Sequence, residues 1–228
     1  MGCSIKWKEK RVTAIVFDLD GTLVDSAPDI RAAANAMLRD QGLAPLDLPT
    51  ITSFIGNGLP KLVERVIRHT GLDMARHEEL TQLTLDHYSR ASCDLTAPYP
   101  GLREVLPQLR EAGFALGICT NKPEAPARDI LDALDLAGFF DAVIGGDTLP
   151  VRKPDPEPLN RTFGQLGRGA GIYVGDSEID AETARRAGVP FLLFTEGYRK
   201  SPVEALPHNA RFDRYADLPA LIERVQAG

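Results

Sequence analysis

Two aspartates, Asp18 and Asp20, close a short apolar run in the sequence IVFDLDGTLVDS (residues 15–26). The run is typical of a buried strand, and side chains two positions apart in a strand lie on the same face. Two neighbouring carboxylates repel each other, so they need a cation between them or a proton on one of them. Mg²⁺ prefers such hard oxygen ligands, and a protonated carboxyl is a general acid. The pattern alone leaves both solutions open, and it also allows an ordinary acidic turn at Gly21.

Three further stretches, ALGICTNK, RKPDP and YVGDSEID, place polar side chains at or after the ends of other predicted strands. These side chains belong to Thr120, Asn121, Lys122, Lys153, Asp176, Ser177 and Asp180. Each has an ordinary alternative as a polar strand end, a solvated lysine or a helix cap. Because the carboxyl ends of parallel strands meet at one edge of a sheet, their coincidence favours a single site. Together they supply a nucleophile, a second acid, phosphate-binding groups, a cation and a metal ligand, which are the parts that phosphoryl transfer requires.

The elements that must position these groups form an α/β pattern. Short apolar runs alternate with amphipathic helical segments, which predicts a Rossmann-like, doubly wound parallel sheet. The predicted strands are residues 12–17, 114–119, 142–144, 171–174 and 190–194.

One interval, between residues 26 and 96, contains only helical patterns. Helices are predicted from Ser26 to Gly42, after the GNGLP sequence, and from about residue 75 to residue 90. The sequence Ser26-x-x-Asp29 with Pro28 predicts a capping box at the first of them. We therefore predict a core of residues 1–24 and 97–228 with a small all-helical cap of residues 25–96 inserted after the first strand. Hinges are expected near residues 24–25 and 97–100.

Composition excludes several classes of function. The chain has 228 residues, is 43% hydrophobic and 25% charged, and carries a net charge of −6, which argues against nucleic-acid or membrane-surface binding. Its three cysteines form no CxxC pair and its four histidines no zinc-binding spacing. We expect a cytoplasmic monomer or homodimer, without a membrane span or signal sequence, acting on a small anionic phosphate substrate.

At the level of whole motifs, the chain resembles the haloacid dehalogenase superfamily of aspartate-nucleophile phosphatases. The resemblance rests on DLDGT, the threonine of CTN, the lysine of RKP, and GDSEID. Longer strings, among them FDLDGTLVDS, IGNGLPKLVERV and VGDSEIDAETARRAG, resemble the phosphoglycolate phosphatase family within that superfamily. The helical insert resembles the small cap of these enzymes. The resemblance implies hydrolysis of a small phosphate monoester, 2-phosphoglycolate above all, through an aspartyl-phosphate.

The same resemblance implies a role for each motif residue. Asp18 is the expected nucleophile, and Asp20 is the acid that protonates the leaving group and later activates water. Thr120 and the Asn121 N–H are expected to bind phosphate oxygens, while Lys153 offsets the charge on phosphate and nucleophile.

A second set of residues is implied for the metal. Mg²⁺ is expected to be held by Asp18, the backbone carbonyl of Asp20, and Asp176. Ser177 and Asp180 are expected to support these ligands from behind.

The cap loop FIGNGLPKLVER predicts contacts to the leaving group. Glycines at positions 56 and 58 allow backbone N–H groups to line up, and a helix start at Pro60 adds its positive dipole. We expect Asn57 and Lys61 to bind a small anionic group such as the glycolate carboxylate, with an ordinary turn and solvated basic side chains as the alternative.

Three other functions stay open from the sequence. A phosphomutase of the same superfamily would use the same aspartates, and a phosphonate-cleaving relative would use Lys61 as a Schiff base. A receiver-like phospho-acceptor module would be phosphorylated only once per chain, and it has no use for the large helical insert. The sequence decides neither the exact substrate, nor Mg²⁺ against Mn²⁺, nor the oligomeric state, nor the role of the segment before Val12.

Overall fold

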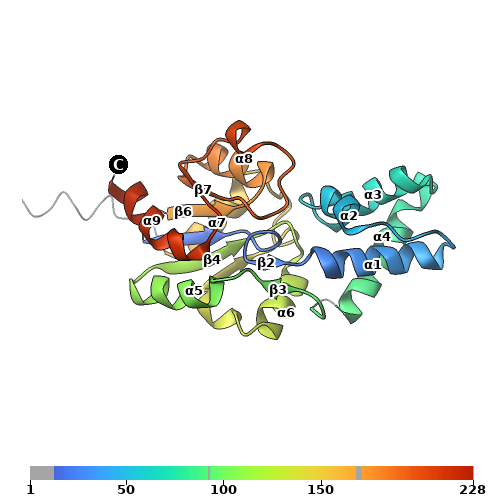
Figure 1. Cartoon of the computed structure of the whole chain (residues 1–228), viewed down its shortest axis with the longest axis horizontal. Helices are drawn as coiled ribbons and strands as arrows, with labels where there is room; N and C mark the ends of the chain where they lie inside the picture. The colour runs from blue at the N-terminus through green and yellow to red at the C-terminus, as the bar shows by residue number, and fades with distance from the viewer. Residues whose placement is uncertain (1–12, 92, 168–170, 228) are drawn as a thin grey trace, which may run out of the picture.

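The computed structural model describes residues 13–91, 93–167 and 171–227 (Figure 1). Within these residues, the main sheet contains six parallel strands in the order β5-β4-β1-β6-β7-β8. The strands are β1 (Ala14–Phe17), β4 (Ala115–Cys119), β5 (Ala142–Ile144), β6 (Gly171–Gly175), β7 (Phe191–Phe194) and β8 (Ala210–Phe212). The predicted α/β fold with a parallel sheet is confirmed.

The sheet is apolar because both of its faces are covered. Successive residues of β1 alternate between two cores, with Ile15 and Phe17 in one and Ala14 and Val16 in the other. The first core also contains residues of α5 (Leu102–Glu111), α6 (Glu124–Ala133) and α9 (Leu218–Ala227), and the second contains residues of α7 (Glu157–Gln165) and α8 (Glu178–Ala187). Figure 1 shows α8 above the sheet and α5 below it.

A helical cap follows the first strand, as predicted, and it lies beyond one end of the sheet (Figure 1). It consists of α1 (Ala27–Asp40), α2 (Leu48–Phe54), α3 (Leu59–Thr70), a 3₁₀ turn at Met74–Arg76, and α4 (His77–Arg90). The cap has its own hydrophobic core, in which Met37, Val63 and Leu80 are fully buried. This separate core allows the cap to hold its shape independently of the sheet that it faces.

A short antiparallel ribbon joins the cap to the core. It pairs β2 (Val24–Asp25) with β3 (Ala97–Pro98), at the positions where hinges are expected. These strands are too short to produce a period-two pattern, so the sequence predicts no strand there. The helix α2 and the edge strand β8 are also absent from the sequence prediction, because both are brief and only partly buried.

Short 3₁₀ turns also occur between the main elements. Single 3₁₀ turns occur at Ala137–Phe139, Val203–Ala205 and Tyr215–Asp217. The predicted start of the first strand at Val12 lies outside the described residues. None of the helices in the described ranges has the length and apolar character needed to cross a membrane.

The capping box predicted at Ser26 and Asp29 is wrong. The Ser26 hydroxyl donates to the Asp20 carboxylate, and the backbone N–H groups of Ser26 and Ala27 donate instead to the phenol oxygen of Tyr198. Asp29 is 2% exposed and accepts hydrogen bonds from the Leu95 and Thr96 N–H groups and from the Thr96 hydroxyl. Ser26 thus binds a carboxylate of the preceding turn, and Asp29 binds a segment more than sixty residues away.

Asp29 therefore ties the first cap helix to the segment that returns to the core. Asp29→Ala leaves two backbone N–H groups and a hydroxyl without their acceptor, and we expect it to lower the free energy of unfolding by about 3 kcal/mol. Urea unfolding followed by circular dichroism measures the change. The matched control is Asp86→Ala on the exposed surface of α4, which we expect to stay within about 0.5 kcal/mol of the parent. Equal stabilities of the two variants would contradict this role of Asp29.

Candidate active site

The predicted site residues meet at the carboxyl ends of neighbouring parallel strands. Asp18 and Asp20 follow β1, while Thr120 follows β4 on one side and Asp176 follows β6 on the other. Lys153 comes from the loop between β5 and α7. The strand order places β1 between β4 and β6, so the two aspartates lie at the centre of the cluster.

Asp18 is paired with Lys153. The Lys153 ammonium lies 3.0 Å from Asp18 Oδ1, and the Leu19 N–H donates to the same oxygen. Burial raises the pKa of the Asp18 carboxyl to about 7, because the favourable charge of Lys153 is opposed by Asp180 and Asp20. The carboxyl is therefore poised to lose its proton when a further positive charge arrives.

Lys153 is itself held on three sides. Its ammonium donates to the Tyr173 hydroxyl at 2.8 Å and to Asp180 Oδ1 at 2.7 Å, and the residue is only 2% exposed. Burial alone would lower the pKa of Lys153, but the carboxylates of Asp18 and Asp180 outweigh it and raise that pKa above its ordinary value. Lys153 is thus a permanent cation beside Asp18.

Asp180 holds this arrangement from behind. It is fully buried, and its Oδ2 accepts from the N–H and hydroxyl of Ser177 in a capping box at the start of α8. Its Oδ1 accepts from Lys153 and from the Tyr173 hydroxyl. Burial favours the protonated form, but Lys153 and these hydrogen bonds keep the pKa of Asp180 below its ordinary value. Both oxygens are engaged by protein groups, which makes Asp180 a positioning residue.

Asp176 faces the same space from β6. Its oxygens accept from the Thr22 hydroxyl at 2.7 Å and from the Tyr198 N–H at 2.6 Å. The backbone turns tightly at Gly21, where φ is +84° and a Cβ would lie 2.6 Å from Asp176 Oδ2. Only glycine allows this approach of the turn to the carboxylate. Burial, together with repulsion from Asp180 and Asp18, raises the pKa of Asp176 well above its ordinary value.

These carboxylates fit a divalent cation. Oxygens of Asp18, Asp176 and Asp180 lie within 4.8 Å of one another, and hard oxygen donors are the ligands that Mg²⁺ prefers. The raised pKa values of Asp18 and Asp176 show that two buried negative charges there lack sufficient compensation. Both oxygens of Asp180 accept hydrogen bonds from protein groups. The ligand set expected from the sequence, Asp18, the Asp20 carbonyl and Asp176, stays a prediction.

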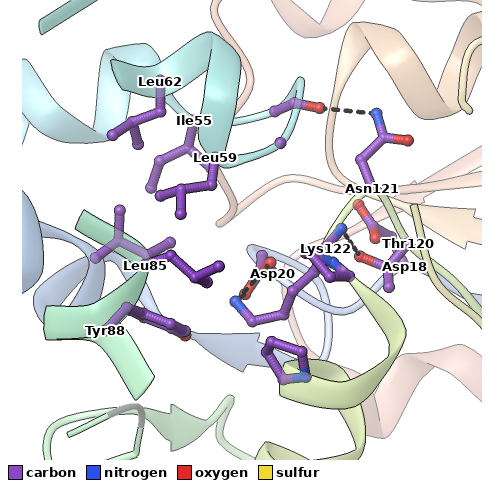
Figure 2. Close-up of a pocket in the computed structure, with 15 residues that line it drawn as sticks. Asp18, Asp20, Ile55, Leu59, Leu62, Leu85, Tyr88, Thr120, Asn121 and Lys122 are labelled. Atoms are coloured by element: carbon purple, nitrogen blue, oxygen red, sulfur yellow. Dashed lines mark hydrogen bonds and ion pairs between the residues drawn. The ribbon is translucent and has the colours of Figure 1, made fainter. Parts of the chain in front are cut away.

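Asp20 is paired with a different lysine, Lys122. The Lys122 ammonium lies 2.9 Å from Asp20 Oδ1 and 3.1 Å from Oδ2, and Ser26 donates to Oδ1. Figure 2 shows the Lys122 side chain extending from the end of β4 across the cavity to Asp20. The two aspartates of the opening motif therefore have separate cationic partners, which gives them different surroundings although they share one cavity.

That cavity lies between the core and the cap. On the core side it is lined by Asp18, Asp20, Thr120, Asn121 and Lys122. The cap contributes mainly apolar side chains, and Figure 2 shows five of them facing the aspartates: Ile55, Leu59, Leu62, Leu85 and Tyr88. Ile30 of the cap also lines the cavity. The cavity has a volume of about 70 Å³, and an adjoining hollow that also reaches Asp18, Asp20 and Asp176 has about 290 Å³.

Asn121 connects core and cap beside the cavity. Its side-chain amide donates to the Gly56 carbonyl of the cap at 3.2 Å and to the Lys153 carbonyl at 3.1 Å. Thr120 is 3% exposed, and its hydroxyl accepts from the Lys122 N–H. Both residues predicted to bind phosphate thus line the cavity beside Asp18.

Asn57 and Lys61, the two cap residues predicted to bind the leaving group, lie in different places. Asn57 lines the larger hollow, where its side-chain oxygen accepts from Arg65. Lys61 is not brought to either hollow that contains the aspartates. It pairs with Glu64 at 2.6 Å, with its side chain 46% exposed, and lines a separate surface depression. The helix turns Lys61 outward, because the two apolar residues that follow it, Leu62 and Val63, occupy the buried face of α3.

The chain matches known proteins in both sequence and fold. A family model described as haloacid dehalogenase-like hydrolase matches residues 15–194, which is well over half of the chain. The chain belongs to the haloacid dehalogenase-like hydrolase family. The superfamily resemblance seen in the sequence is confirmed.

Individual proteins similar to this hydrolase are named as phosphatases. A phosphoglycolate phosphatase of Cereibacter sphaeroides (strain ATCC 17029 / ATH 2.4.9) is 50% identical over 215 residues, covering 93% of this chain and 99% of the relative. One from Rhodobacter capsulatus is 46% identical, with coverage of 92% and 96%. A crystal structure of a predicted phosphoglycolate phosphatase from Haemophilus somnus 129PT has a TM-score of 0.87 at 30% identity, covering 92% of this chain and 97% of that chain. The chain is a phosphoric monoester hydrolase.

Several residues of the hydrolase site are not predicted by sequence motifs. The sequence places Lys122 at a strand end but assigns it no role. Tyr88, Tyr173 and Tyr198 carry no motif, yet each contacts or faces a charged group of the site. An isolated tyrosine has no spacing that distinguishes a site residue from a core residue, so only the fold identifies these three.

The raised pKa of Asp18 predicts how cation binding depends on pH. In the folded chain without metal, Asp18 keeps its proton up to a pH of about 7, whereas its ordinary pKa is 3.8. A cation must displace that proton, so we expect the apparent affinity for Mg²⁺ to fall about tenfold per pH unit below pH 7 for each proton displaced.

The raised pKa of Asp18 also makes the stability of the fold depend on pH. A carboxyl whose folded-state pKa is raised stabilises the metal-free fold at low pH, and this contribution is lost as the pH rises through about 7. Mg²⁺ should therefore raise the melting temperature more at pH 8 than at pH 5.5. Calorimetric titration and thermal unfolding with Mg²⁺ or EDTA measure both effects, and Asp18→Asn should flatten the dependence. An affinity for Mg²⁺ that is equal at both pH values would exclude the proposed proton displacement.

Proposed function

We propose that this hydrolase is a Mg²⁺-dependent phosphatase whose principal substrate is 2-phosphoglycolate, which it converts to glycolate and phosphate through an aspartyl-phosphate on Asp18. The observation that carries the proposal is that Asp18 and Asp20 face one cavity while each is paired with its own lysine. Two carboxylates in different surroundings are suited to different roles. The names of the curated relatives support the choice of substrate.

In the first step, a carboxylate oxygen of Asp18 attacks phosphorus, and the bond from phosphorus to the ester oxygen breaks. Asp20 donates a proton to that ester oxygen, so glycolate leaves as the alcohol. Lys153 stays beside Asp18 and offsets the negative charge of the phosphoryl group as it approaches. Thr120 and the Asn121 N–H are placed to bind the phosphoryl oxygens.

In the second step, water attacks the phosphorus of the aspartyl-phosphate. Asp20, now the base, takes a proton from this water, and the bond from phosphorus to Asp18 breaks. Free phosphate and the original carboxylate result. Asp18, the Asp20 carbonyl and Asp176 would hold Mg²⁺, which shields the negative charges of nucleophile and phosphate from each other.

The size and lining of the cavity favour a small substrate. At about 70 Å³ it holds about half a dozen water-sized groups, and the adjoining hollow of about 290 Å³ adds room beside Asp176. The apolar cap residues present few hydroxyl-binding groups to a sugar, which disfavours a hexose phosphomutase. The outward position of Lys61 disfavours Schiff-base chemistry on a phosphonate.

A substrate panel tests the proposed specificity. We expect 2-phosphoglycolate to have the highest kcat/KM when it is compared with glucose 6-phosphate, AMP, pyrophosphate and p-nitrophenyl phosphate. Turnover should require added Mg²⁺ and stop with EDTA. If another ester of the panel were clearly preferred, the chain would still be a phosphatase but the glycolate assignment would be rejected.

The covalent step is tested separately with Asp18→Asn. Because an amide cannot replace the carboxylate nucleophile, we expect a loss of about a thousandfold or more in kcat. Rapid quenching of the parent enzyme during turnover should leave a phosphoryl group on Asp18, detectable by peptide mass spectrometry, and none in the variant. Turnover of Asp18→Asn at the parent rate would rule out the nucleophilic role.

A further inference from the structure

None of the described cap residues that line the cavity next to Asp18 and Asp20 carries a positive charge. Among the described residues that line the cavity next to Asp18 and Asp20, Lys122 carries the only positive charge, and it comes from the core. A glycolate leaving group carries a carboxylate that must be desolvated in this apolar space, which is costly unless a positive partner is provided.

Lys122 is well placed to be that partner. It is 8% exposed, and its ammonium contacts both oxygens of Asp20. Asp20 must approach the ester oxygen to protonate it, and in phosphoglycolate the carboxylate is separated from that oxygen by a single methylene carbon. An ammonium beside Asp20 is therefore also beside the position of the carboxylate.

Tyr88 supplies a second, independent observation. It comes from α4 of the cap, and the Lys122 ammonium lies 4.7 Å from the centroid of its ring. Tyr88 is 4% exposed, and its hydroxyl interacts with the Lys122 ammonium without making a hydrogen bond of good geometry to that or any other residue in the described parts of the chain. Buried polar groups without a hydrogen bond of good geometry are rare in folded proteins and call for an explanation such as a ligand. Figure 2 shows the Tyr88 ring directed into the cavity next to Lys122.

We propose that the Lys122 ammonium and the Tyr88 hydroxyl together form the carboxylate-binding subsite for the leaving group. This inference rests on the proposed phosphoglycolate phosphatase function and names the residues that make it selective. Both groups are donors, and a carboxylate has two oxygens to receive them. Since one donor comes from the core and the other from the cap, the subsite is complete only when the cap lies against the core.

Other cations near the aspartates are engaged elsewhere. Arg65 donates to the Phe54 carbonyl and to Asn57 within the cap loop. Lys200 lines the other hollow, on the side of Asp176, where its ammonium donates to the Ile55 carbonyl. Lys122 differs from both because it reaches the acid that must touch the leaving oxygen.

The test compares 2-phosphoglycolate with 2-hydroxyethyl phosphate, which replaces the carboxylate by a neutral alcohol. For the parent enzyme we expect kcat/KM to favour phosphoglycolate by about a hundredfold or more. Lys122→Met should reduce this ratio to within a few-fold of one, because it removes the positive charge that binds the carboxylate. Any loss through Asp20 affects both esters and cancels in the ratio. Tyr88→Phe should lower the ratio about tenfold, and Lys122→Arg should retain most of the preference.

A binding measurement removes the dependence on acid catalysis. 3-Phosphonopropionate, in which a methylene group replaces the ester oxygen, should inhibit the parent more strongly than propylphosphonate, which lacks the carboxylate. Lys122→Met should remove this difference. Arg128→Met, an exposed position on α6, is the matched control and should leave both ratios unchanged.

The outcomes distinguish failure of the proposed function from failure of the proposed subsite. A parent enzyme that does not distinguish the two esters would overturn the phosphoglycolate function and the subsite together. A parent preference that survives in Lys122→Met, or that is lost in Lys61→Met instead, would overturn the subsite alone and leave the function standing. A circular dichroism spectrum of Lys122→Met matching the parent shows that the fold is retained. If that variant is misfolded, Tyr88→Phe decides: an unchanged ratio there rejects the subsite.

Discussion

The structure depends on compensating the charge of carboxylates crowded into one buried space. Asp18, Asp20, Asp176 and Asp180 converge at the ends of β1 and β6 and the start of α8, and four negative charges there would not be tolerated without partners. Lys153 neutralises Asp18 and Asp180, and Lys122 neutralises Asp20. The remaining deficit lies at Asp18 and Asp176, where the raised pKa values mark the place for a divalent cation. The proposed catalytic roles and the proposed metal site both follow from this distribution of charge.

The fold supplies these partners because the strands are parallel and buried on both faces. A central β1 flanked by β4 and β6 brings the ends of three strands to one edge, while the helices on either side keep water from the cores beneath it. The cap closes the other side of the cavity with apolar residues. Tyr198 joins these parts, since its N–H donates to Asp176 and its hydroxyl donates to Asp25 at the start of the cap. Tyr198 thus links Asp176 directly to the connection between core and cap.

Where sequence reasoning succeeded, the signal was local. The strand ends carrying Asp18, Thr120 and Asp176 follow apolar runs, and Lys153 precedes a proline, so type and spacing were enough to gather them at one edge. Where it failed, contacts made in the folded chain outweighed the local pattern. Ser26 and Asp29 have the spacing of a capping box, but the first binds Asp20 and the second binds Leu95 and Thr96. Lys61 lies in a suggestive loop, yet the amphipathic pattern of α3 turns it outward.

By itself, the sequence determined the α/β architecture, the helical insertion after the first strand, and the residues that meet around the nucleophile. These properties depend on apolar periodicity and on motifs within a few residues of each other, which a linear reading contains. Only the tertiary structure decided which lysine accompanies which aspartate, that the cap offers an apolar surface, and that Tyr88 brings its buried hydroxyl beside Lys122. Such pairings join residues separated by many positions, and their energies depend on distance and burial, which exist only once the chain has folded.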